Sequence, residues 1–75
     1  MKSKLTIGDT VWTNVQMYFV EASNPVTGAE IETRFHRGQN LTVVAVNEKE
    51  NTIDVQLADG FVATIDRDNV NGVDD

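Results

Sequence analysis

The chain has 75 residues, 40% of them hydrophobic, and it contains no cysteine. That length predicts one domain with a small core, and the lack of cysteine excludes disulfides and thiolate metal sites as sources of stability. Twelve acidic residues against six basic ones give a formal net charge of −6. Such a charge keeps a small domain in solution, repels phosphate backbones and attracts basic partners, so direct nucleic-acid binding is disfavoured.

Nothing in the sequence predicts membrane association or export. No apolar run approaches the roughly 18 residues that a membrane-spanning helix needs. The basic start, Met1 to Lys4, is followed by Gly8 and Asp9 rather than by the apolar segment of a signal peptide. We therefore expect a cytoplasmic protein that forms a single domain over residues 1–75, with frayed ends at 1–4 and 74–75.

The N-terminal half predicts strands and one long loop. Residues 10–15 are rich in β-branched side chains, as strands are, and residues 17–20 continue that character. A loop is expected over 23–28, which contains a proline and a glycine. Residues 29–35 alternate between apolar and polar side chains, the pattern of a strand with one wet face. The apolar face of that strand would carry Ala29, Ile31, Thr33 and Phe35.

The C-terminal half contains three further β-rich runs, separated by polar breaks. Residues 41–46 are apolar almost throughout, which predicts a strand buried on most sides. A charged hairpin loop is expected over 47–51, followed by an alternating strand over 52–58. The inward face of that second strand would carry Ile53, Val55 and Leu57.

The dipeptide Asp59-Gly60 favours a two-residue hairpin turn of type I′. Pairing across such a turn places Val62 opposite Leu57 and toward the core. The residues that would then point the other way are Phe61, Ala63 and Ile65. Either a bulge resets this register, or an apolar strip faces outward.

Five or six short antiparallel strands in so short a chain predict an all-β fold. A small barrel buries one face of each strand, and the pattern favours that architecture. The polar residues 66–69 predict a turn. After it, Val70 and Val73 would close the barrel.

The order of features over residues 38–70 resembles the second half of an SH3 domain. The matching features are Gly38 at a diverging turn, Leu41 and Val43 on a strand, the polar loop 47–51, Val55, the segment Gly60-Phe61-Val62, a 3₁₀ turn from Arg67 to Asn69, and Val70. The resemblance implies an SH3-like small β-barrel. It does not imply binding of proline-rich peptides, because Thr52 and Ile53 replace the family's tryptophan pair and Ala63 replaces its groove proline. The opening, Ile7 to Trp12, is also similar to the first strand of Tudor-like and KOW-like barrels.

Aromatic and acidic side chains are the candidate binding residues. We expect Phe19 and Phe35 in the core, where aromatics supply much of the buried area. Trp12, Tyr18 and Phe61 fit the core and the surface equally well, and on the surface they would form the predicted aromatic contact patch. The acidic residues predicted to steer a basic partner are Glu21, Glu30, Glu32, Glu48 and Glu50.

These observations favour a non-catalytic protein-protein interaction module that binds a basic or apolar partner surface. The single histidine, His36, lies in a predicted turn, and no arrangement of side chains predicts catalysis, a metal site or a cofactor. One alternative is a small acidic inhibitor, of the kind that phages encode, that blocks a nucleic-acid-binding protein by charge mimicry. Another is an accessory subunit of a larger assembly that pairs through its edge strands.

Overall fold

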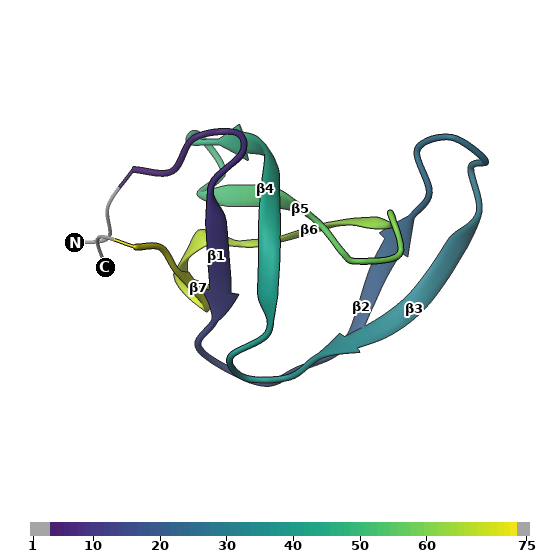
Figure 1. Ribbon diagram of the computed structural model, residues 1–75, viewed down its shortest axis with the longest axis horizontal. Helices are drawn as coiled ribbons and strands as arrows, with labels where there is room; N and C mark the ends of the chain where they lie inside the picture. Colours follow the sequence, from purple (N-terminus) through teal and green to yellow (C-terminus); the bar gives the residue numbers. More distant parts are fainter. Residues whose placement is uncertain (1–3, 74–75) are drawn as a thin grey trace.

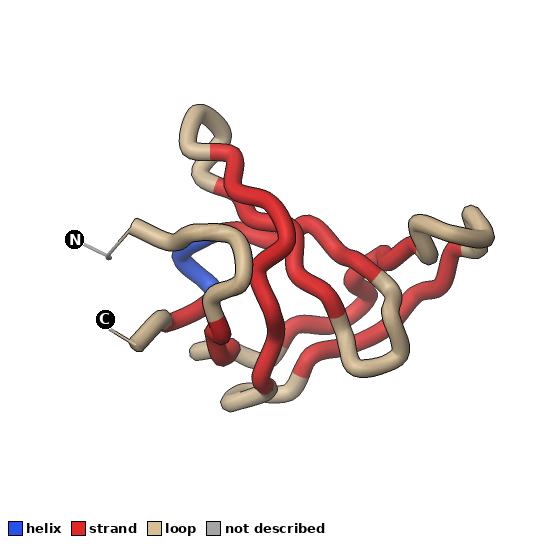
Figure 2. The backbone as a smooth tube through the Cα atoms, turned by 45° about the horizontal axis from the view of Figure 1, so that its top comes forward, coloured by secondary structure: helices blue, strands red, loops and turns tan. Residues whose placement is uncertain are grey.

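The computed structural model describes residues 4–73 as one antiparallel sheet of seven strands, curled into a half-barrel (Figure 1). The strands are β1 (Thr10–Thr13), β2 (Met17–Ser23), β3 (Glu30–Phe35), β4 (Asn40–Asn47), β5 (Thr52–Gln56), β6 (Val62–Asp66) and β7 (Val70–Asn71). Within residues 4–73 the one helical segment is a 3₁₀ turn, η1, at Arg67–Asn69 (Figure 2). The predicted all-β class is confirmed, and the architecture is compatible with an SH3-like fold.

The strand order in the sheet is β3-β2-β6-β5-β4-β1-β7. Strands β1 and β4 to β7 form the curled part of the sheet, whereas the β2–β3 hairpin extends away from it on one side (Figure 1). The outer edges are therefore β3, six residues long, and β7, two residues long. This arrangement leaves much of the hairpin without a layer against which it could bury an apolar face.

The core lies on the concave side of the curled sheet. The buried apolar residues are Leu5, Val11, Ala22, Phe35, Leu41, Val43, Ile53, Val55, Ala63, Ile65 and Val70. Phe35 is the largest fully buried side chain, which confirms its predicted place in the core. Alternation explains most of the set, because every second residue of β1, β5 and β6 faces inward.

Thr13 is a buried polar residue that ties the end of β1 to the turn between β3 and β4. Its hydroxyl donates to the carbonyl of His36 and accepts a hydrogen bond from the Gln39 N–H at 3.0 Å. The Gly38 N–H donates to the Thr13 carbonyl at 2.7 Å. A buried hydroxyl is tolerated because its hydrogen-bonding capacity is used, and here it fixes where the hairpin leaves the barrel.

The turn between β5 and β6 differs from the predicted type I′ turn. Gly60 alone in this turn has a positive φ, +91°, and its N–H donates to the Leu57 carbonyl at 3.0 Å. The Leu57 N–H donates to the Phe61 carbonyl at 2.8 Å, so Gln56 pairs with Val62. This is the longer turn with a glycine bulge, and it shifts the register by one residue.

That shift turns Ala63 and Ile65 inward, and both are buried. The prediction that Val62 faces the core opposite Leu57 is therefore wrong, because a one-residue slip exchanges the two faces of a strand. Of the two alternatives that the sequence left open, the structure shows the bulge. Phe61 is half-buried and packs against the core.

Several other residues that were predicted to lie in the core are exposed or only partly buried. In β4 only Leu41 and Val43 are buried, because a bulge interrupts the strand between Val43 and Ala45. Ile31 on β3 is 38% exposed, since it lies on the extended hairpin. Val70 is buried as predicted, whereas Val73 is 83% exposed and does not close the barrel.

The predicted frayed ends at residues 1–3 and 74–75 lie outside the described residues. Lys4 is described, and its ammonium lies 3.0 Å from a carboxylate oxygen of Glu48. In the part of the chain that the structure describes, no helix is long and apolar enough to cross a membrane.

Candidate functional site

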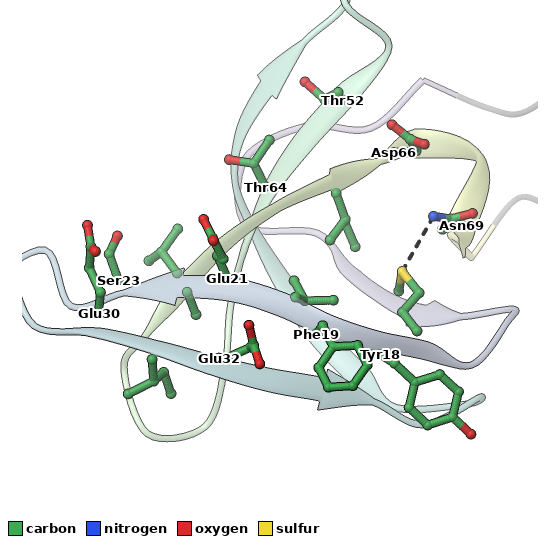
Figure 3. A pocket seen from close by; sticks show the side chains of 16 residues that line it. Tyr18, Phe19, Glu21, Ser23, Glu30, Glu32, Thr52, Thr64, Asp66 and Asn69 are labelled. Atoms are coloured by element: carbon green, nitrogen blue, oxygen red, sulfur yellow. Dashed lines mark hydrogen bonds between the residues drawn. The ribbon is translucent and has the colours of Figure 1, made fainter.

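A groove of about 980 Å³ lies between the β2–β3 hairpin and strand β6 (Figure 3). It forms because β2 pairs with β6 at two positions only, Ala22 with Ala63 and Ser23 with Val62. At the other end of β2, the side-chain amide of Asn69 donates to the sulfur of Met17 at 3.4 Å. Between these two attachments β2 bows away from β6 and leaves the groove open.

A bulge in β2 produces the bow. The register between β2 and β3 shifts between Met17 and Val20, so two residues of β2, Tyr18 and Phe19, stand against one of β3. Phe19 has a φ of +60°, in the left-handed region that bulky residues rarely adopt. Such a conformation costs on the order of 1–3 kcal/mol and persists only where the surrounding structure enforces it.

The bulge exposes two aromatic rings. Phe19 is 76% exposed and Tyr18 is 57% exposed, with ring centroids 6.4 Å apart and planes inclined by 45°. The prediction that Phe19 lies in the core is therefore wrong. The positive φ of Phe19 breaks the alternation of side chains that would have turned the ring inward. The hairpin also has no core at this position. Figure 3 shows both rings at one end of the groove.

Four carboxylates line the same groove: Glu21, Glu30, Glu32 and Asp66. Glu21 lies directly opposite Glu32 in the β2–β3 pair, and like charges in that relation destabilise a sheet. Among the described residues that line the groove, none is a lysine or arginine. Within residues 4–73, none of these four carboxylates forms an ion pair. The groove is thus an acidic surface with two exposed rings at one end.

The structure brings together four of the eight predicted binding residues. The groove is lined by Tyr18, Glu21, Glu30 and Glu32. Tyr18 lies with Phe19 at one end, and the three glutamates lie along the hairpin (Figure 3). The other four lie outside it. Trp12 is half-buried on β1, opposite Asn40 and Asn71.

The remaining three predicted residues lie in turns. Phe61 is in the turn between β5 and β6, while Glu48 and Glu50 are exposed in the turn between β4 and β5. The predicted patch of Trp12, Tyr18 and Phe61 is therefore not assembled in this groove. Glu48 is instead the partner of Lys4.

Sequence reasoning missed Phe19 and Asp66 as groove residues. For Phe19 the available signal was misleading: neighbouring residues of a strand point to opposite faces, so an exposed Tyr18 predicts an inward Phe19, and the bulge in β2 breaks that alternation. Asp66 gave no such signal, because its place beside β2 depends on pairing between strands distant in sequence.

The single histidine lies outside the groove. His36 is exposed in the turn after β3 and is not among the residues lining the groove. Among residues 4–73, no group of three or more His, Cys, Asp or Glu side chains is placed to hold a metal ion. Comparisons with protein-family models, with curated proteins and with solved structures found no match.

Proposed function

We propose that this protein is a non-catalytic interaction module whose groove binds a basic, extended segment of a partner protein. The observation that carries the proposal is the left-handed Phe19, which holds an exposed aromatic pair beside four carboxylates that form no ion pair within residues 4–73. Aromatic faces and carboxylates together suit lysine and arginine side chains, through cation–π contacts and charge-assisted hydrogen bonds. Strain and like-charge repulsion are both costs to folding that a binding role accounts for.

The chemistry of the groove favours an extended segment of the partner over a flat partner surface. The open groove runs along β2, with rings at one end and carboxylates along its length (Figure 3). An extended chain that places an apolar or cationic side chain against Tyr18 and Phe19 would bring later basic side chains to Glu21 and Glu32. The net charge of −6 would attract such a partner before contact.

We further infer an SH3-like barrel for the fold. The support is the succession of β4, β5 and β6, the 3₁₀ turn and β7, which fall at the positions of the resemblance in residues 38–70. The proposed function does not borrow the proline-peptide specificity of SH3 domains, whose groove residues this chain lacks. We place the protein in the cytoplasm as part of the same proposal.

Two other functions from different classes compete with this one. An acidic inhibitor of a nucleic-acid-binding protein is favoured by the same uncompensated carboxylates, which would stand in for phosphates. An accessory subunit is favoured by the free edge of β3. Affinity capture from lysate at low and high salt separates the first two, because charge mimicry is lost as salt rises, whereas aromatic contacts persist. Displacement of the captured partner by DNA would favour the inhibitor.

The proposal is tested by mapping where a basic peptide binds. The isotope-labelled protein is titrated with an unstructured peptide that alternates arginine and apolar residues, and backbone amide shifts are followed by NMR. We expect shifts to concentrate at Tyr18 to Glu21 and Thr64 to Asp66, on the two sides of the groove. Shifts centred on the exposed turn at Glu48 to Glu50 would refute the assignment of the groove.

A further inference from the structure

Strand β3 forms an outer edge of the sheet, and its far side pairs with no strand in residues 4–73 (Figure 1). The Asn24 N–H donates to the Ala29 carbonyl at 2.8 Å, which fixes the hydrogen-bonding phase of the hairpin. Main-chain groups therefore turn toward β2 at Ala29, Ile31 and Thr33. They turn outward, to the free edge, at Glu30, Glu32 and Arg34.

The free edge lacks the usual protections against pairing. Its sequence, Glu-Ile-Glu-Thr-Arg-Phe, contains no proline, and the bulge of the hairpin lies in β2 rather than in β3. Charged side chains are present, but they have both signs. The opposite edge, β7, has only two residues and offers far less main chain for pairing.

The charges of β3 are complementary to themselves. If Thr33 lies opposite Thr33 of a second antiparallel copy, Glu32 lies opposite Arg34 of that copy, and Arg34 opposite its Glu32. All four are outward-facing positions, so each pair exchanges both of its main-chain hydrogen bonds. Symmetric registers centred on Ile31 or Glu32 set glutamates against each other, and one centred on Arg34 sets two arginines against each other. Within residues 4–73, Arg34 has no ion pair that this arrangement would break.

We propose that β3 pairs antiparallel with β3 of a second copy of this chain, in the register centred on Thr33. The sheets of the two copies then continue across a two-fold axis, with an isologous contact. The contact adds opposite-charge pairs on one face and a Thr–Thr pair on the other, both of which stabilise antiparallel strands. The inference does not rest on the proposed function, although the two share Glu32, which lines the groove and here faces Arg34 of the second copy.

The first test reverses charges and follows self-association by analytical ultracentrifugation at about 0.15 M salt, where long-range repulsion between acidic copies is screened. The wild type should shift from monomer to dimer as its concentration rises. R34E and E32R should each weaken the dimer by about tenfold or more, because two attractive pairs become repulsive. An equimolar mixture of R34E and E32R should regain association, since every facing pair is then opposite in charge.

Three results of that experiment would overturn the proposal. A wild type that stays monomeric at every concentration excludes the dimer. If R34E associates as strongly as the wild type, the dimer does not form through β3. If the mixture associates no more strongly than either variant alone, the register centred on Thr33 is wrong. K49E serves as the control, and it should leave association unchanged, because it makes the same change of charge as R34E in the exposed turn between β4 and β5.

The second test uses the absence of native cysteine. In the proposed register the two Thr33 residues form a non-hydrogen-bonded pair, with Cα atoms about 4.5 Å apart, within the range that a disulfide spans. T33C should therefore form a dimer under mild oxidation. T42C is the matched control, because Thr42 is exposed on β4, which pairs on both sides. Equal cross-linking of the two variants would contradict the proposed interface.

Discussion

Glu21 lies directly opposite Glu32 in the antiparallel pair of β2 and β3, and both carboxylates face a groove whose lining contains no cation. Opposed like charges lower the stability of a sheet. A small domain with a limited core has little stability to lose, and the basic ligand proposed above would relieve this repulsion. Several properties of the chain can be predicted from it and from the backbone around it.

Removal of one charge of this pair should stabilise the free protein. E21Q should raise the free energy of unfolding by roughly 0.5 kcal/mol, because it relieves a direct cross-strand repulsion. Urea denaturation at low salt measures this effect, and high salt should reduce it. E50Q, in an exposed turn, controls for the general loss of negative charge. Equal stabilisation by the two variants would show that the cross-strand relation has no particular effect.

The left-handed Phe19 should be a second site where stability is gained by substitution. F19N should raise the free energy of unfolding by about 1 kcal/mol, because asparagine adopts positive φ far more readily and the ring contributes little burial. Equilibrium denaturation of F19N and F19A separates the two contributions, since alanine removes the ring and keeps the strain. Destabilisation by F19N would show that the exposed ring supports the fold.

Gly60 should be required for the register of β5 and β6. G60A should cost about 1–2 kcal/mol, because an added methyl group meets no atom within 4 Å but φ is +91°. The loss is thus conformational rather than steric. G60N is the matched comparison and should cost less than G60A, since asparagine tolerates this region. Thermal unfolding of both variants would reveal a steric origin if asparagine proved the worse of the two.

The Thr13 hydroxyl should contribute to stability well beyond its size. T13V keeps the shape of the side chain but removes the group that donates to His36 and accepts from Gln39. We expect a loss of about 1–3 kcal/mol, the cost of leaving buried polar groups unpaired. T13S retains the hydroxyl and should lose less. Denaturation curves in which T13V is at least as stable as T13S would show that the hydroxyl contributes no more than the methyl group does.

Local sequence patterns predicted the strands well, because they depend on side-chain alternation and turn residues. The loop between β2 and β3, the strand now called β3, a turn after β6 and buried Val70 all followed from such patterns, while the 3₁₀ turn at Arg67–Asn69 followed from the resemblance. The register after Asp59-Gly60 did not, because a two-residue turn and a glycine bulge share the same dipeptide. One hydrogen bond, from Leu57 to Phe61, distinguishes them.

The groove was only half predictable, for a related reason. Tyr18, Glu21, Glu30 and Glu32 were recognisable as candidates from residue type alone. Their assembly depends on where β2 separates from β6, which is a property of tertiary pairing between segments about 40 residues apart. Side-chain chemistry can therefore be anticipated from the sequence here, whereas the geometry that unites Phe19 with Asp66 cannot.

The most direct test compares two double variants that remove the same charge. E21Q/E32Q acts inside the groove and E48Q/E50Q outside it, and each changes the net charge from −6 by the same two units. Calorimetric titration with the arginine-containing peptide measures affinity for each. The groove variant should lose at least about tenfold, as expected when hydrogen bonds to charged groups are removed, and the outer variant much less. Equal losses would show that the peptide responds to overall charge and would contradict a binding site in the groove.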